Sequence, residues 1–286
     1  LQARRMKPMV RCADDFAVHA GASQGIAHLA RQGRLSATSA MVLSPRWPQD
    51  VALLQELRGR IDVGLHLDWT SDFAVHAGHG LSLGAAMRRA LLGGFDPAVA
   101  QGVIERQLDL FEAQWGAPPD HVDGHQHVQQ FAGIREPLIQ TLARRYPGRL
   151  PYLRVSRVRA GAGERLGFKS RVITGLGAEA MKKVADTVDV PRAESLFGIY
   201  DFEGDTARYA ALMDGWLARA PAGGLLMCHP AGTSPPDDAI GAARGREYSY
   251  LDSADFAAAL ARAQVALVRG RTHYTRGHDA AARLDR

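Results

Sequence analysis

Short apolar runs alternate along the chain with longer segments of helical periodicity, and this alternation limits the folds available to it. The runs that predict buried strands cover residues 9–12, 40–43, 63–67, 121–123, 152–155, 225–228 and 265–268. The segments that predict amphipathic helices cover residues 21–32, 48–57, 97–115, 134–145, 178–187, 206–219 and 253–263. A strand followed by a helix, repeated many times, predicts a mainly parallel sheet with helices outside it.

For a chain of 286 residues, the simplest closure of such a sheet is an α/β fold of a single domain, a distorted or incomplete (β/α) barrel. An open doubly wound sheet is the alternative. The rhythm breaks at residues 68–84, 156–177 and 230–249, where we expect long lid or binding loops. We expect a flexible segment at residues 1–8, the barrel domain at 9–275 and a tail at 276–286.

Composition excludes several classes of protein. Apolar residues make up 46% and charged residues 23%, as in an average globular domain, and no apolar run reaches the roughly 18 residues of a membrane span. The net charge of +5 comes from scattered arginines, without zinc-finger spacing or a basic helix, so no nucleic-acid partner is predicted. Cys12 and Cys228 are too few and too far apart for a disulfide framework, which favours a cytoplasmic protein.

Aspartate and histidine side chains fall where predicted strands end. These residues are Asp14, Asp15, His66, Asp123, His125, His127 and His229. Because the carboxyl ends of parallel strands meet on one face, we expect them in one site. Each histidine alone could be a buried residue bonded to a carbonyl, but four converging segments favour a metal site. Two imidazoles and one carboxylate suit zinc, iron, cobalt or manganese and leave positions open for catalysis.

The adjacent Asp14 and Asp15 should have different roles, because successive side chains of a strand face opposite sides. We expect one to bind the ion and the other to take a proton from water, whose pKa the ion lowers. His229, held extended by the proline that follows it, should lie across the site from them and could protonate a leaving group.

The stretch "HVDGHQH", residues 121–127, should supply one ligating imidazole. Asp123 could accept the other ring N–H of a ligating histidine and fix its tautomer. His121 and His127 are then supporting or substrate-binding residues, with solvated turn residues as the alternative.

Five stretches carry a resemblance to a known family. They are "ADDF" at 13–16, "GRLSATSAMV" at 33–42, "VGLHLDWT" at 63–70, "PPDHVDGHQHV" at 118–128 and "MCHPAG" at 227–232. In this order the chain resembles the YdjC-like carbohydrate deacetylases, which include chitooligosaccharide deacetylases and hopanoid-associated deacetylases. The resemblance implies a distorted (β/α) barrel that hydrolyses the N-acetyl group of an amino sugar and releases acetate.

The resemblance also implies residue roles. Asp15, His66 and His125 would be the ligands of one divalent metal ion, Asp14 the proton acceptor and His229 the general acid. The family's ion is magnesium in some members and zinc in others, and two imidazole ligands favour zinc.

Other side chains would contact the sugar. Trp69, like Phe73 or Trp47, could stack on a sugar face, with a place in the core as the alternative. Arg154 could bind a hydroxyl or an acidic group or form a surface ion pair. The family's usual glycine and later histidine are replaced by Ala17 and Gln129, positions that we expect to line the sugar pocket.

Two alternatives remain open from the sequence. One is a metal-dependent hydrolase of another bond, such as a phosphoester, and the other is a carbohydrate-binding protein without turnover. For the proposed enzyme the partner is a small N-acetylated carbohydrate, and a homodimer is left open.

Overall fold

One long strand organises the sheet. In the computed structural model, which describes residues 6–158 and 168–275, β1 (Lys7–Phe16) pairs in parallel with β2 (Ala37–Ala40), β8 (Gly224–Cys228) and β9 (Val265–Leu267). From β2 the ladder continues through β3 (Asp62–Leu67), β4 (His121–Gly124), β5 (Tyr152–Arg154) and β6 (Arg192–Ala193), and from β8 to β7 (Leu196–Phe197). All these pairings are parallel.

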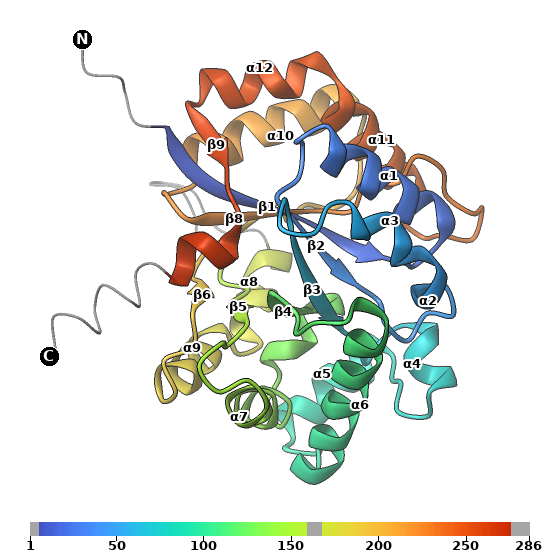
Figure 1. Cartoon of the computed structure of the whole chain (residues 1–286), viewed down its shortest axis with the longest axis vertical. Coiled ribbons are helices and arrows are strands. Elements are labelled where there is room, and N and C mark those ends of the chain that lie inside the picture. Colours follow the sequence, from blue (N-terminus) through green and yellow to red (C-terminus); the bar gives the residue numbers. More distant parts are fainter. Residues whose placement is uncertain (1–5, 159–167, 276–286) are drawn as a thin grey trace, which may run out of the picture.

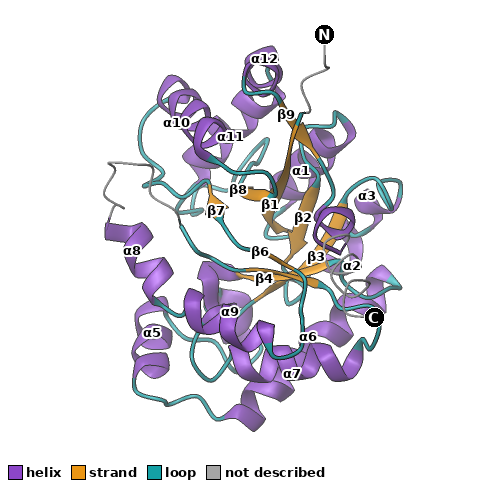
Figure 2. Ribbon diagram, turned by 90° about the vertical axis from the view of Figure 1, so that its left-hand side faces the viewer, coloured by secondary structure: helices purple, strands orange, loops and turns teal. Residues whose placement is uncertain are grey.

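The sheet curves into a nearly closed barrel, with β6 and β7 at its two ends. Both belong to the same extended segment, 192–197, which passes from β5 to β8. Helices lie outside the strands (Figures 1 and 2). The prediction of a distorted or incomplete (β/α) barrel is confirmed, and the open doubly wound sheet is wrong.

Helices of very different length surround the barrel. They are α1 (Ala20–Arg31), α2 (Trp47–Asp50), α3 (Ala52–Gln55), α4 (Asp72–His76), α5 (Leu83–Leu91), α6 (Pro97–Trp115), η1 (His125–Gln130), α7 (Arg135–Arg145), α8 (Phe168–Gly175), α9 (Ala178–Asp186), α10 (Thr206–Arg219), α11 (Gly241–Asp252) and α12 (Ala254–Arg262). Across the described part of the chain, none of the helices combines the length and the apolar character that a membrane crossing needs.

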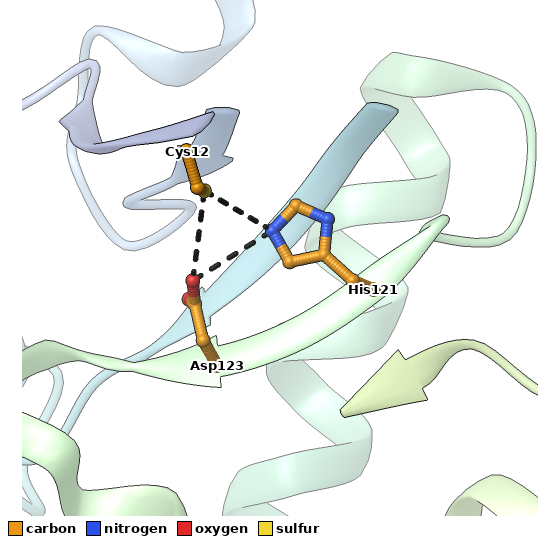
Figure 3. A group of neighbouring side chains, drawn as sticks. All are labelled: Cys12, His121 and Asp123. Atoms are coloured by element: carbon orange, nitrogen blue, oxygen red, sulfur yellow. Dashed lines mark hydrogen bonds and ion pairs between the residues drawn. The ribbon is translucent and has the colours of Figure 1, made fainter. Parts of the chain in front are cut away.

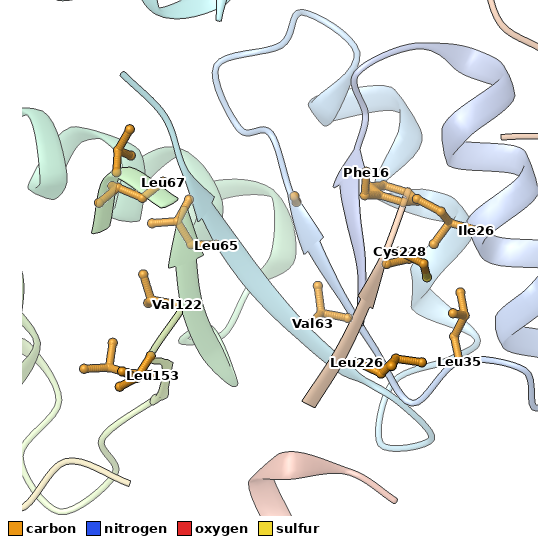
Figure 4. Close-up of a cluster of buried hydrophobic side chains, with 14 of the residues drawn as sticks. Phe16, Ile26, Leu35, Val63, Leu65, Leu67, Val122, Leu153, Leu226 and Cys228 are labelled. Atoms are coloured by element: carbon orange, nitrogen blue, oxygen red, sulfur yellow. The ribbon is translucent and has the colours of Figure 1, made fainter. Parts of the chain in front are cut away.

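The core lies between the strands and these helices. Phe16 of β1 packs with Ile26 of α1, and Leu65, Leu67 and Val122 fill the space beside β3 and β4 (Figure 4). Burial of these aliphatic and aromatic side chains is the main stabilising term of such a domain. The apolar positions of the strands and helices predicted from the sequence therefore form this core.

Some predicted boundaries differ from the structure. The strand predicted at 40–43 is β2, three residues earlier, because its Thr38 and Ser39 are buried and hydrogen-bonded despite being polar. β6 and β7 were not predicted, since two residues give no periodicity. β1 already includes Lys7 and Pro8, which were placed in the flexible segment. Residues 1–5 and the tail 276–286 lie outside the described residues.

The expected long loops contain helices. The stretch 68–84 includes α4 and the start of α5, and the described part of 156–177 includes α8. The stretch 230–249 includes most of α11, whose buried residues include Arg244 and Glu247. Charged side chains on the inner face hide the apolar period by which a helix is recognised. Residues 159–167 of the second stretch are outside the description.

A glycine in β3 makes room for a histidine of β4. A Cβ built on Gly64 would lie 2.4 Å from two ring atoms of His121, and the ring of His121 stacks on Tyr152 with centroids 5.0 Å apart. Gly64 and Tyr152 therefore confine the imidazole of His121 on two sides.

We expect Gly64→Ala to lower the free energy of unfolding by about 1–3 kcal/mol, the usual cost of overpacking a core. Gly102→Ala is the matched control, because Gly102 lies in α6 with no atom within 4 Å of an added Cβ. That change should raise stability by about 0.5–1 kcal/mol. Urea denaturation measures both, and equal effects of the two substitutions would contradict this packing.

Candidate active site

The candidate site is a cavity of about 770 Å³ at the carboxyl ends of the strands. Sites for small molecules commonly enclose about 300–1,000 Å³. The polar residues that line it include Asp14, Asp15, His66, His125, His127 and His229. The predicted convergence of separate strand ends on one place is therefore present in the structure.

The two adjacent aspartates diverge because the backbone turns between them. The pairing of β1 with β2 is irregular between Ala13 and Phe16, and Asp15 has a φ of 63°, in the left-handed region that L-residues seldom adopt. Asp14 contacts Arg154, whereas Asp15 contacts histidines. This arrangement is compatible with two different roles for them.

Asp15, His66 and His125 bring three donor atoms together. Asp15 Oδ1 lies 3.3 Å from His66 Nε2 and 3.1 Å from His125 Nδ1, and one atom from each residue lies within 4.8 Å of the others. Donors that share a tetrahedral zinc ion at about 2.0–2.1 Å are separated by about 3.3 Å. The donor set and its spacing fit a divalent ion of the zinc type, with the cavity on the open side.

His66 is oriented from behind by Asp123. Its Nδ1 lies 2.6 Å from Asp123 Oδ1 and 3.1 Å from Ser39 Oγ, so that Nε2 faces Asp15. This is the predicted contact in which a carboxylate fixes the tautomer of an imidazole. Burial alone would lower the pKa of His66, but the charges and hydrogen bonds of Asp123 and Asp15 raise that pKa to about 10.

Arg154 joins two carboxylates inside the barrel. Its guanidinium makes two hydrogen bonds to Asp14, at 2.7 and 2.6 Å, and Nη2 lies 2.5 Å from Asp123 Oδ2. The side chain is fully buried and is not among the residues that line the cavity. The predicted surface ion pair and the predicted contact with a sugar are therefore both wrong, because strand β5 carries this residue inward.

The charge of Arg154 acts on Asp123. Burial alone would raise the pKa of Asp123, but Arg154 and then His66 hold it well below its usual range. Asp15 is in a similar position, because Arg244 and the two histidines outweigh burial and keep its pKa low. Both carboxylates are therefore anionic acceptors at neutral pH.

His229 lies beside Asp14 rather than across the site from it. Its Nε2 is 3.9 Å from Asp14 Oδ2, and its Nδ1 is 4.0 Å from Glu247 Oε1. Glu247 also accepts a hydrogen bond of 2.6 Å from the backbone N–H of His229. The expected separation is wrong because β8 and β1 are neighbours in the sheet.

The remaining histidines of "HVDGHQH" are buried, so the solvated-turn alternative is wrong for both. The alternation of the strand ends at Gly124, after which Gln126 and His127 have φ values of 53° and 63°. His127 lines the cavity with Nδ1 2.8 Å from Ser156 Oγ. Burial and the charge of Arg154 lower its pKa to about 3, so its ring is neutral.

His121 points away from the cavity. Its Nε2 lies 3.6 Å from Cys12 Sγ and 3.6 Å from Asp123 Oδ2, in a fully buried cluster beneath the site (Figure 3). It is not among the cavity-lining residues, so the substrate-binding alternative is wrong and the supporting role stays a prediction. Through Asp123 the cluster touches the residues that orient His66.

Three positions expected around the sugar are part of the core. Trp69 is 3% exposed and packs edge-on against His79 and Phe95. Ala17 is fully buried with a φ of 72°, a conformation that glycine adopts without steric cost. Gln129 is fully buried and donates hydrogen bonds to the carbonyl of Arg154 and to Ser156. None of the three lines the cavity, so these expectations are wrong.

Arg244, a residue of α11 that lines the cavity, was not predicted from the sequence. Its Nη2 donates to Asp15 Oδ2 at 2.8 Å and its Nε to Asp238 Oδ2 at 2.8 Å. One oxygen of Asp15 is thus bound by Arg244 while the other faces the histidines. Arg244 is separated from Asp15 by 229 positions, so no local pattern links the two.

One wall of the cavity is aliphatic. Leu83 and Met87 come from α5, and Val172 and Ile173 come from α8, on the left-hand side in Figure 2. The charged lining residues come from the strand ends and also from α4 and from α11 with the loop before it. A ligand in this cavity would therefore meet both an aliphatic wall and charged groups.

Comparisons with known proteins give a family. The model of the YdjC-like protein family matches residues 9–262. A chitooligosaccharide deacetylase of Serratia marcescens is 29% identical over 151 residues, and one of Yersinia pestis (strain Pestoides F) is 32% identical over 147 residues. Each match covers 48% of this chain and 56% of the relative, so the chain spans about half the length of these relatives.

A solved structure supports the fold. It belongs to an Enterococcus faecalis V583 protein described as a candidate for cellobiose-phosphate cleavage. The two structures align with a TM-score of 0.70 at 19% sequence identity, over 94% of this chain and 99% of that one. At this identity the likeness concerns the fold alone.

We expect Arg154→Met to lower the free energy of unfolding by about 3–5 kcal/mol, because it leaves Asp14 and Asp123 buried without their cation. Arg262→Met is the control, since Arg262 pairs with Asp214 and the two side chains are 62% and 55% exposed. That change should cost less than about 1 kcal/mol. Urea denaturation compares them, and similar losses would argue against the buried pairing.

Acid should destabilise the metal-free protein through Asp15 and Asp123. Their lowered pKa values contribute stability that is fully present above the unfolded pKa of about 3.9 and is lost as the pH falls through the folded values. Urea denaturation between about pH 6 and pH 2 should give a slope of at most about 1.4 kcal/mol per pH unit for each group. Asp15→Asn should flatten this acid limb, and Asp255→Asn, at an exposed position, should not.

Proposed function

This chain belongs to the YdjC-like family, and we propose that it is a metal-dependent carbohydrate N-deacetylase that removes the acetyl group of an amino sugar as acetate. The observation that carries the proposal is the convergence of Asp15, His66 and His125 beside Asp14, on the floor of the cavity. The names of the relatives agree with it.

The three donor residues would hold one divalent ion, and zinc suits two imidazoles better than magnesium does. When bound, the ion supplies Lewis acidity that polarises the acetyl carbonyl and acidifies water. Asp123 keeps Nε2 of His66 available for this role, and Arg244 keeps one oxygen of Asp15 away from it.

Asp14 is the proton acceptor of the proposed reaction. Its two oxygens receive hydrogen bonds from Arg154, which fixes the direction of the carboxylate towards the cavity. Asp14 takes a proton from the attacking water as the new C–O bond forms at the acetyl carbon. His229 Nε2 then gives a proton to the nitrogen whose bond to that carbon breaks, so that acetate and a free amine leave.

The phosphoester alternative finds less support. A phosphate group would call for a free cation in the site. Arg244, which lines the cavity, and Arg154, buried behind Asp14, are each bound to two carboxylates. The cytoplasmic location and the homodimer remain predictions.

The test is release of acetate from a panel of N-acetylated sugars by protein of known metal content. Chelation should abolish turnover and zinc should restore it. Asp14→Asn should lower kcat by about 10²–10⁴-fold, as loss of a general base does. His125→Ala should weaken zinc binding, whereas His28→Ala, at a surface position paired with Asp252, should leave both quantities unchanged.

One outcome would overturn the proposal. If the protein binds sugar but releases no acetate with any divalent ion added, the carbohydrate-binding alternative replaces it. Release of phosphate from a phosphorylated sugar under the same conditions would favour the other alternative.

A further inference from the structure

The ring of His229 lies between two buried carboxylates. Nε2, on one edge of the imidazole, is 3.9 Å from Asp14 Oδ2, and Nδ1, on the other edge, is 4.0 Å from Glu247 Oε1. Asp14 comes from β1 and Glu247 from α11, so the ring bridges the sheet and a helix outside it. The sequence pattern gave no role to Glu247.

Glu247 is fixed in place by neutral donors. It is 1% exposed, its Oε2 accepts the backbone N–H of His229 at 2.6 Å, and its Oε1 accepts the hydroxyl of Tyr200 at 2.8 Å. Within residues 6–158 and 168–275, the only cationic group paired with this carboxylate within 4.0 Å is the imidazole of His229. The charge of the buried guanidinium of Arg11 also interacts with Glu247, without an ion pair between the two. A buried carboxylate favours a proton on the ring beside it.

Nδ1 of His229 is buried and makes no hydrogen bond to any described residue. A buried polar atom without a partner costs about 1–3 kcal/mol, and the acceptor next to it is Oε1 of Glu247. A small rotation of the ring would turn the distance of 4.0 Å into a hydrogen bond. The ring of His229 also packs against Phe202, with the two ring centroids 5.4 Å apart and the planes at 80°.

We propose that Glu247 is a positioning residue that holds a proton on Nδ1 of His229 and so keeps Nε2 as the proton donor towards the cavity. The proposal rests on the proposed function, because that function supplies the amine that accepts the proton from Nε2. In the reaction the Nε2–H bond of His229 breaks and an N–H bond forms on the departing amine. The ring is then left as the Nδ1–H tautomer, with its proton facing Glu247.

Other charged groups also face this histidine. Asp14 lies on its Nε2 side, and Arg244 Nη1 is 3.4 Å from its backbone carbonyl oxygen. His127 is a further lining residue of the same cavity. Asp14 and Arg244 are unchanged by substitution of Glu247, so their influence is common to all the variants compared.

Nuclear magnetic resonance of the imidazole nitrogens tests the proposal without a measurement of enzyme activity. In wild-type protein at high pH, we expect His229 to be the Nδ1–H tautomer, and its protonation midpoint to fall by about one pH unit or more in Glu247→Gln. Glu247→Asp keeps the charge and should restore part of the shift. Glu112→Gln is the matched control, because Glu112 also accepts a tyrosine hydroxyl, that of Tyr146, on the outside of the barrel.

Kinetics on the best substrate of the acetate panel gives a second measure. Glu247→Gln should lower kcat by about 10–100-fold and move the alkaline limb of its pH profile to lower pH, with KM changed less than about twofold. Glu247→Asp should recover part of kcat. A purely structural role would lower the amount of folded enzyme without moving the pH profile.

Two results would overturn the proposal. One is an Nε2–H tautomer of His229 in the wild-type protein, which needs no variant to fold. The other is the same protonation midpoint in wild type and in folded Glu247→Gln or Glu247→Asp. If the midpoint shifts but no sugar releases acetate, the positioning by Glu247 stands and the proposed function fails.

Discussion

The geometry of the site depends on the buried guanidinium of Arg154. It binds the carboxylates of Asp14 and Asp123 at the same time, in a space from which water is excluded. Two carboxylates so close together would otherwise repel each other and lose their hydration. Asp123 pairs with Arg154 through one oxygen and orients His66 through the other, and His66 faces Asp15. The position of the donor atoms of His66 and Asp15 thus follows from an arginine that never reaches the cavity.

The sequence predicted the elements whose burial is uniform. Strand β8 is a continuous apolar run and β3 is apolar apart from Asp62 and His66, so their existence and place could be read directly. β2 was displaced because Thr38 and Ser39 replace apolar burial with hydrogen bonds to other strands. Helix α11 was missed because two of the side chains that it buries, those of Arg244 and Glu247, are charged. These elements owe their position to partners far away in the chain, which a local pattern does not contain.

The same distinction between local patterns and distant partners explains which features of the site could be predicted. Aspartates and histidines at strand ends could be grouped because parallel strands all end on one face. Which way each side chain points depends on local turns and on strand neighbours, so Arg154, Trp69 and His229 were assigned wrong surroundings. Arg244 and Glu247 come from a helix that packs across the strand ends, and their contacts with Asp15 and His229 exist only in the folded protein.

Segment 192–197 closes the barrel and forms a seam, a junction at which few residues pair. β6 and β7 each contribute two paired residues to their neighbours, whereas β1 and β8 share five pairs. Local opening begins where the fewest backbone hydrogen bonds must break. The chain runs from this seam directly into Ile199 and Tyr200, which line the cavity. The short ladders that close the barrel therefore lie next to the part of the chain that lines the cavity, whereas His66 lies on a strand paired on both sides.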